Sequence, residues 1–445
     1  MTYKTFVSSR SQVTAALMIG VYLTIASRSH FNQMLVDATG GRHQVYSAMN
    51  VVYQVAYAAI QVPASMCADH MDPVPALAIV PLMLALTSAV APFVLWYVDW
   101  TASAPLPISS IVAIGALFAV NGASLGAWWP FMNVMVSNWA PPDRLAVMYG
   151  TINTGLPGGI ALGNAVCGFA YSVHETTFRY SFFVVSAVCA LWSAVWWHAF
   201  YRFPADDPGV RPDELEHLTA AIRPKIKLPV PWRSLATSVP VWCVAVANYG
   251  STVFYTVLIM YMPVYLKETL KVAIGRNGFL STLPSLGQLA MLWWSGWLAS
   301  AVHTRQWTGV TNIRKALTAV GMVVPALVLL TAVAVFADRY VFYGSLVLAY
   351  ALSGAVFSGF RVSQMEMAPN FVAAITAVCD VVGSLAMNST HVAFIVAFGD
   401  TADQATWNDI CLGLSAALVA CACPFLLAGS SDVQPWNDGP QSSSP

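Results

Sequence analysis

The chain has 445 residues, of which 58% are hydrophobic and 9% are charged, and its formal net charge at pH 7 is +0. An ordinary soluble domain has about 25% charged residues, so this composition excludes a water-soluble globular protein and predicts a multi-pass membrane protein. The balanced charge gives no reason to expect a nucleic-acid partner.

Apolar windows follow one another along the whole chain, and twelve of them are long enough to span a bilayer. A hydrocarbon core of about 30 Å needs about 20 apolar residues per helix. The first window carries Arg28 and is too long for a cleaved signal peptide, so we interpret it as a span. The approximate limits are 12–36, 44–68, 74–98, 110–135, 146–170, 180–201, 238–266, 277–302, 315–337, 340–364, 370–398 and 407–429. The sequence therefore predicts an all-α membrane protein with twelve transmembrane helices.

The longest polar segment, residues 202–237, divides the windows six and six. We predict an N-terminal half at 1–201, a cytoplasmic linker at 202–237, a C-terminal half at 238–429 and a cytoplasmic tail at 430–445. A short surface helix is expected to start near Asp213. Lys and Arg are more frequent in the segments that lie inside when the N-terminus is inside, which predicts that both termini and the linker are cytoplasmic.

The loop "VSNWAPPDR" (136–144) joins the fourth and fifth windows. Its prolines end the fourth helix, because a residue before proline disfavours helical geometry, and Trp139 suits the interfacial belt. A glycine-rich run at 155–159 then predicts close packing or a bend in the fifth helix.

A similar segment in the second half of the chain, "MAPNF" (367–371), joins the tenth and eleventh windows. Asn153 and Asp380 each lie 11 residues after the proline of their loop, so both are expected at the same depth of corresponding helices. Twelve helices in two related halves is the major facilitator plan, with the substrate path between the halves near the midplane.

Six segments in chain order carry a more specific resemblance. They are "WWPFMNVMVSNWAPPDR" (128–144), "TSVPVWCVAVANYGSTVFYTVLIMYMPVYLKETL" (237–270), "GFLSTLPSL" (278–286), "TNIRKALTAVGM" (311–322), "GFRVSQMEMAP" (359–369) and "AGSSDVQPW" (428–436). Together they resemble the anion:cation symporters of the major facilitator superfamily, a group that includes sialin, the vesicular glutamate transporters and sodium/phosphate cotransporter-like proteins. The resemblance implies secondary transport, often of organic or inorganic anions, driven by protons, sodium or membrane potential.

The chain departs from that family at charged positions. Members that move acidic substrates often carry an arginine in helix one, and Arg28 matches it. The arginine and glutamate common in helix four are replaced by apolar residues, with Leu125 in place of the glutamate, and the helix-seven arginine is absent. A histidine often stands where this chain has Asn133, whereas Arg361 and Asp380 stand where the family usually has asparagine.

Charged and polar residues inside the spans are the candidate substrate-binding residues, because an intramembrane charge is costly. The donor fork of Arg28 suits a carboxylate or phosphate, and the alternative is a structural ion pair or hydrogen bonds to backbone carbonyls. Tyrosines and amides at similar depth either line the path or hold helices together. The predicted substrate-binding set is Arg28, Tyr53, Tyr57, Gln61, Asn133, Asn153 and Tyr255.

Asp380 is the carboxylate that the windows place near the middle of a span, so we predict that it is the proton-coupling residue. The alternative is a structural partner for an arginine elsewhere in the bundle. Asp69, Arg144 and Glu366 fall on predicted inner loops and are the candidate gate residues. Arg361 lies near the inner end of helix ten, where snorkelling to the interface explains it.

Nothing in the sequence suggests an enzyme. The eight cysteines form no CxxC pair, and we find no catalytic set, metal-ligand spacing or cofactor motif. The expected function is secondary active transport of a small organic anion by a monomer through alternating access, coupled to protons, sodium or membrane potential. The alternatives are a carrier of a neutral or cationic solute and a transport-inactive, receptor-like protein. Either the plasma membrane or a vesicular or lysosomal membrane fits.

Overall fold

The computed structural model describes residues 8–39, 43–68, 71–97, 108–141, 145–221, 230–335, 338–397 and 404–438. Every element within these ranges is a helix, which confirms the all-α prediction. Nine of the described helices are long and apolar enough to cross a membrane. Three further long helices, α1 (Ser9–Thr39), α13 (Thr282–Thr304) and α18 (Val372–Ala397), coincide with the three remaining predicted windows.

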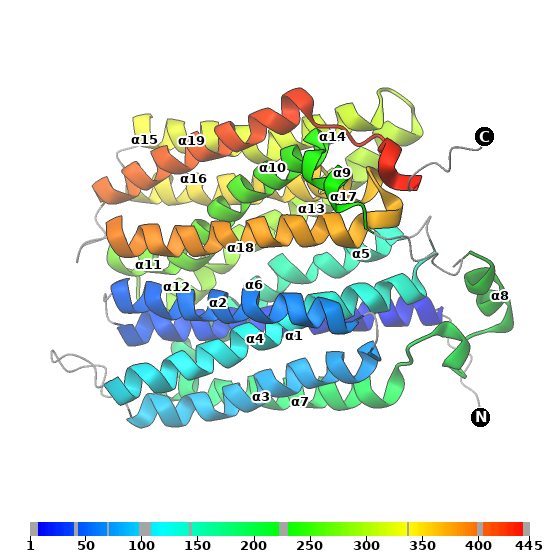
Figure 1. Cartoon of the computed structure of the whole chain (residues 1–445). Coiled ribbons are helices and arrows are strands. Elements are labelled where there is room, and N and C mark those ends of the chain that lie inside the picture. Colours follow the sequence, from blue (N-terminus) through cyan, green and yellow to red (C-terminus); the bar gives the residue numbers. More distant parts are fainter. Residues whose placement is uncertain are drawn as a thin grey trace, which may run out of the picture. The chain divides into compact units, whose positions relative to one another are not determined.

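The chain folds into two compact units. Figure 1 shows the whole chain, coloured from blue at the N-terminus to red at the C-terminus. The first unit contains Met1–Lys225 together with Ile274–Thr282, and the second contains Ile226–Ala273 together with Leu283–Pro445. Each unit is a bundle of long helices joined by short loops.

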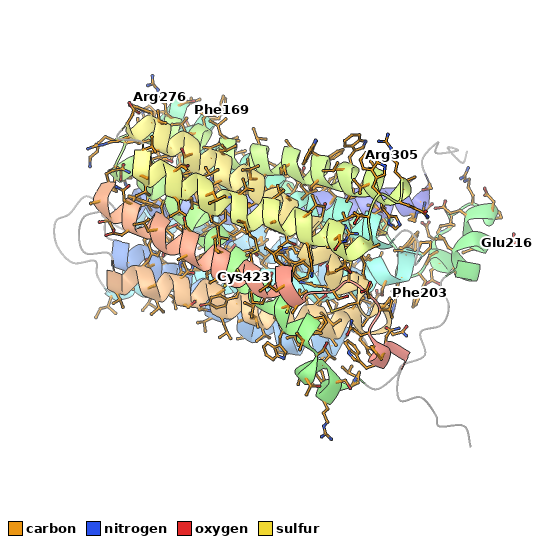
Figure 2. All side chains as sticks on the ribbon, turned by 90° about the horizontal axis from the view of Figure 1, so that it is seen from above. Phe169, Phe203, Glu216, Arg276, Arg305 and Cys423 are labelled. Atoms are coloured by element: carbon orange, nitrogen blue, oxygen red, sulfur yellow. The ribbon has the colours of Figure 1, made fainter. Side chains whose placement is uncertain are left out.

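The first unit is built from α1 and its neighbours packed in pairs. Helix α1 packs against α6, α2 against α4, and α3 against α7, while the short α12 packs on α6. Arg276 on α12 and Phe169 on α6 lie at the same end of this unit (Figure 2). The other bounds are α2 (His43–Ala68), α3 (Pro73–Tyr97), α4 (Ile108–Trp139), α5 (Leu145–Asn153), α6 (Gly155–Val173), α7 (Glu175–Ala199) and α12 (Ile274–Leu280).

The fifth predicted span is interrupted at Thr154, between α5 and α6. Beyond this break, glycines of α6 bring its backbone against α1. A Cβ on Gly159 would lie 2.7 Å from the carbonyl oxygen of Tyr22, and one on Gly163 would meet that of Ala26. The predicted close packing of the glycine-rich run is therefore confirmed.

A second pair of glycines, Gly122 and Gly126, brings α4 directly against α2. A Cβ on Gly122 would meet the carbonyl oxygen of Tyr53, and one on Gly126 would meet that of Tyr57. Small residues four positions apart let two membrane helices approach to backbone contact. This contact fixes the backbone of α2 at the two tyrosines that the sequence singles out.

Two of the three helix pairings of the first unit recur in the second. Helix α10 packs against α18 and α19, and α15 packs against α16 and α19. In the numbering of the predicted spans, span seven packs on span eleven, as span one packs on span five. Span nine packs on span twelve, as span three packs on span six. The similarity of the two halves therefore includes these helix contacts. The helices are α9 (Trp232–Thr237), α10 (Val239–Thr256), α11 (Met262–Glu268), α13, α14 (Val310–Thr318), α15 (Val324–Val335), α16 (Arg339–Leu352), α17 (Phe360–Glu366), α18 and α19 (Gln404–Ala428).

Three spans of the second unit change their winding. Helix α10 continues into the π-helical segment η2 (Val257–Tyr261), and α14 continues into another, η3 (Ala319–Val323). Helix α16 tightens into the 3₁₀ segment η4 (Ser353–Phe357). Such segments re-aim the side chains that follow them, and π-helical turns are common at functional sites.

The first part of the polar linker, residues 202–221, packs with the first unit. The predicted surface helix is present as α8 (Pro212–Ala221), preceded by the 3₁₀ segment η1 (Pro204–Asp206). Glu214 of α8 accepts hydrogen bonds from the backbone N–H groups of Ser9 at 3.2 Å and Arg10 at 3.1 Å. A carboxylate at this position satisfies the free donors of a helix start and meets its positive dipole end.

Trp139 differs from its predicted place in the interfacial belt. Its side chain is fully buried, and its indole N–H donates to the carbonyl oxygen of Tyr201 at 3.1 Å. The carbonyl groups just past a helix end lack helical partners, and a buried indole N–H needs an acceptor. Trp139 therefore joins the end of α4 to the chain after α7.

We expect Gly122→Ala to lower the unfolding free energy by about 1–3 kcal/mol, because the added methyl group overpacks the contact between α4 and α2. Gly115→Ala in the same helix is the matched control, since its Cβ would meet only Met49 Sδ at 3.9 Å. Thermal unfolding of the two purified variants in detergent measures the difference. Equal Tm values for both would contradict the packing described here.

Candidate functional site

The first unit holds Arg28 against Tyr53, and Tyr53 stacks on Tyr57. The Arg28 side chain is half-buried on α1, and its Cζ lies 3.6 Å from the ring centroid of Tyr53 on α2. The Tyr53 ring is buried and stacks with that of Tyr57, with centroids 6.4 Å apart and an interplanar angle of 13°. The positive charge of a guanidinium is attracted to the face of an aromatic ring, and its N–H donors suit a bidentate acceptor.

The other predicted residues of the first unit do not join this group directly. Gln61 is half-buried one turn after Tyr57, and Asn133 is half-buried on α4. Asn153 is buried and donates to the carbonyl oxygen of Tyr149 in its own helix at 2.8 Å. Within the described ranges, no hydrogen bond links these three amides to Arg28.

In the second unit, Tyr255 belongs to a polar group drawn from three spans. Gln288 of α13 donates to the Tyr255 hydroxyl and to Ser353 Oγ, the latter at 3.1 Å. The Tyr255 ring packs edge to face on Tyr350 and Phe357, with centroid distances of 5.6 and 6.3 Å. These contacts fix the Tyr255 ring from two sides.

Two opposite charges lie beside this group. The Arg361 Cζ lies 4.8 Å from the Phe357 ring centroid, and its buried Nε has no hydrogen-bond partner among the described residues. Asp380 is half-buried on α18, and Arg361 lies close enough to Asp380 and Tyr255 to act on both electrostatically. In the part of the chain that the structure describes, no ion pair within 4.0 Å joins Arg361 to Asp380.

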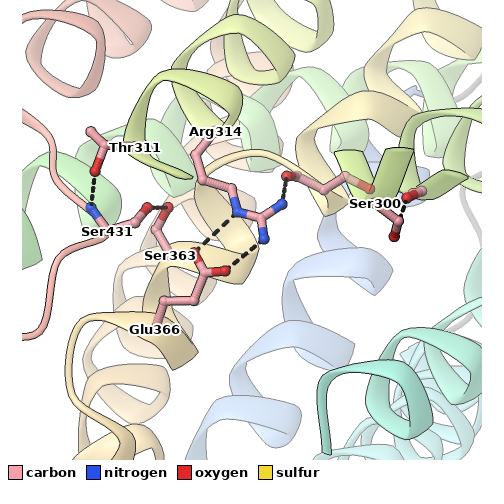
Figure 3. A network of polar contacts seen from close by, with 8 residues as sticks. Ser300, Thr311, Arg314, Ser363, Glu366 and Ser431 are labelled. Atoms are coloured by element: carbon pink, nitrogen blue, oxygen red, sulfur yellow. Dashed lines mark hydrogen bonds and ion pairs between the residues drawn. The ribbon is translucent and has the colours of Figure 1, made fainter. Parts of the chain in front are cut away.

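Glu366, a predicted gate residue, forms a two-pronged ion pair with Arg314 (Figure 3). Arg314 Nε lies 3.0 Å from Glu366 Oε2, and Nη2 lies 2.6 Å from Oε1. Arg314 Nη1 also donates to the carbonyl oxygen of Ser358 at 2.8 Å. The pair joins α14 to the end of α17, with side-chain exposures of 15% and 27%. The other predicted gate residues, Asp69 and Arg144, lie outside the described residues.

Several residues of these groups are not foreseen by the sequence reading. Gln288 is a polar amide in an apolar window. Because a buried amide needs a hydrogen-bond partner, its place in the sequence could have indicated one. Arg314 counts in the sequence only as a positive charge on an inner segment. Arg361 is expected to snorkel, yet its Nε is enclosed by protein and its guanidinium packs on Phe357.

A family model described as "Major Facilitator Superfamily" matches residues 13–389. Sialin from Ovis aries is 27% identical over 275 residues, which are 60% of this chain and 54% of sialin. Sialin from Homo sapiens is 25% identical over 74% of this chain and 67% of its own length. The vesicular glutamate transporter 2 from Mus musculus is 25% identical over 76% of this chain and 59% of its own length. The chain thus spans about half to two thirds of these relatives, and the predicted resemblance to the anion:cation symporters is confirmed.

Solved structures agree on the fold. The inward-open xylose transporter XylE from E. coli superposes with a TM-score of 0.67 at 13% identity, covering 94% of this chain and 95% of that one. A D-xylose–proton symporter gives 0.70 at 12% identity, covering 95% and 99%. Both are major facilitator folds, so the predicted fold class is confirmed, whereas identities this low say nothing about substrate.

We expect Arg314→Lys to lower the unfolding free energy by about 1–3 kcal/mol, because a single ammonium cannot make the forked contact with Glu366 and also reach Ser358. Arg305→Lys is the control, since Arg305 is exposed and packs only loosely on Trp307, 5.1 Å from its ring centroid. The control should stay within about 0.5 kcal/mol of the parent in thermal unfolding. A loss of the same size in both variants would show that the fork contributes nothing.

Proposed function

The chain belongs to the major facilitator superfamily, and on that premise we propose that it is a secondary active transporter of a small organic anion, working by alternating access. Its relatives in the comparisons are membrane transporters rather than enzymes. Some of them are, by name, transporters of glutamate, an anion, and this supports an anionic substrate here.

The observation that carries the proposal is that each unit holds a guanidinium against an aromatic face within its membrane-spanning part. Arg28 lies on Tyr53 in the first unit, and Arg361 lies on Phe357 in the second. Charge inside a bilayer is costly, so such groups are functional by default. The fork of N–H donors that each guanidinium carries suits the planar, two-pronged carboxylate.

Asp380 supplies a mechanism for coupling to protons. When Asp380 is ionised, its charge offsets that of Arg361 and weakens the attraction of the second unit for an anion. When Asp380 binds a proton, the positive charge of Arg361 is left to the substrate. Proton and anion thus favour each other's binding, which is the reciprocal coupling that symport requires.

A neutral or cationic solute is the second candidate, because Asp380 is an intramembrane anion in a chain that lacks the helix-four and helix-seven arginines of its relatives. The two candidates are separated by uptake into liposomes that contain the purified protein, with competing carboxylates, neutral solutes and cations at equal concentration. We expect carboxylates to compete. Competition by cations alone would select the second candidate, and absence of any uptake across the panel would favour a receptor-like protein.

We expect Arg28→Gln to weaken the apparent affinity for the carboxylate that competes best by about tenfold or more, since a charge-assisted hydrogen bond is worth about 1.5–3 kcal/mol. Arg28→Lys should recover little, because one point charge cannot replace the fork. Arg305→Gln is the control, because it removes the same charge from an exposed arginine outside the predicted site. Unchanged affinity in Arg28→Gln at normal abundance would remove Arg28 from the site.

We expect Asp380→Asn to abolish accumulation driven by a pH gradient while exchange of substrate for substrate continues, because the amide cannot carry a proton through the cycle. Asp409→Asn changes an exposed carboxylate in the same unit and should leave both rates unchanged. Counterflow and pH-jump uptake in the same liposomes provide the two measurements. Intact pH-driven accumulation in Asp380→Asn would exclude Asp380 as the coupling residue.

A further inference from the structure

The chain does not end at its last span: residues Gly429–Asp438, here called the C-terminal strap, fold back on the second unit. The strap ends in the 3₁₀ segment η6 (Pro435–Asp438). The Gln434 N–H donates to the carbonyl oxygen of Met367 at 2.8 Å. Asn370 donates twice to Asn437, from its backbone N–H to Oδ1 and from its Nδ2 to the carbonyl oxygen, both at 3.0 Å.

Ser431 connects the strap to two helices at once (Figure 3). Its backbone N–H donates to Thr311 Oγ1 on α14 at 3.2 Å, and its hydroxyl lies 2.7 Å from Ser363 Oγ on α17. Ser431 is 6% exposed and Ser363 is fully buried, so water has little access to this bridge. Just before the strap, Lys315 donates to the carbonyl oxygen of Leu427 in the last turn of α19 at 3.3 Å.

The bridge and the ion pair join the same two helices one turn apart. Thr311 precedes Arg314 by three residues on α14, and Ser363 precedes Glu366 by three residues on α17. Residues three apart lie on the same face of a helix. The faces of α14 and α17 are therefore joined twice, directly by Arg314 and Glu366 and through the strap by Thr311, Ser431 and Ser363.

We propose that the C-terminal strap is a positioning element for the Arg314–Glu366 pair. A partly exposed ion pair contributes little by itself, because two long side chains must be ordered against solvent screening. The strap removes part of that cost by fixing the distance between the helices that carry the two charges. The role of the pair as a gate rests on the proposed function, whereas its dependence on the strap does not.

The test is a double-mutant cycle read by thermal unfolding of the full-length protein in detergent. Glu366→Gln is measured in the parent and in Ser431→Ala. We expect Ser431→Ala to remove at least about half of the Tm loss that Glu366→Gln causes in the parent, because the two changes act on one junction. Ser431→Thr, which keeps the hydroxyl, should restore the loss. Additive Tm shifts in the cycle would overturn the proposal.

Two further variants keep the test decisive. Ser430→Ala is the matched control, since among the described residues the Ser430 hydroxyl bonds only Asp432. The full effect of Glu366→Gln should remain in this control. Should Ser431→Ala fail to fold, Thr311→Val breaks the same bridge from α14 with a side chain of the same shape, and the same reduction is expected. Thermal unfolding needs no substrate, so the two proposals can fail separately. If the Tm shifts of the cycle are non-additive but the protein shows no uptake, the transport function is refuted and the role of the strap is supported.

Discussion

Gly122 of α4 lies directly against the backbone of α2 at Tyr53, and the position of the Tyr53 ring under Arg28 depends on that contact. The second unit contains the same device. A Cβ on Gly354, in the tenth predicted span, would lie 3.1 Å from the backbone nitrogen of Leu292 and would meet the carbonyl oxygen of Gln288, in the eighth. Gln288 in turn holds Tyr255, in the seventh. In each unit a glycine thus allows close contact with the helix that carries a positioning residue. That residue is Tyr53 in the first unit, where it contacts Arg28, and Gln288 in the second, where it binds Tyr255.

The same kind of glycine contact positions different residue types in the two units. In the first, an aromatic ring supports a cation, whereas in the second an amide supports a phenol, and the charges Arg361 and Asp380 lie nearby on later spans. Related halves can therefore keep one packing arrangement while the polar and charged residues that it holds differ.

Much of the fold could be predicted from the sequence, because bilayer thickness turns each span into a long apolar window and prolines mark its end. The winding changes at η2, η3 and η4 could not, since one extra or missing residue in a turn leaves hydropathy unchanged. Arg28 could be selected as an intramembrane charge, and Tyr53 and Tyr57 as polar residues on one face of the second span. The partners of Tyr255 and Glu366 could not, because Gln288 and Arg314 lie 33 and 52 residues away in sequence and no local pattern joins them.

The cap that Glu214 places on α1 has a consequence for biogenesis. The donors it satisfies belong to Ser9 and Arg10, 205 and 204 residues earlier in the chain. During synthesis this cap can therefore form only after all six predicted spans of its half and part of the linker have left the ribosome. The linker thus completes the first helix, and a chain cut before residue 214 leaves those donors to water at the membrane surface.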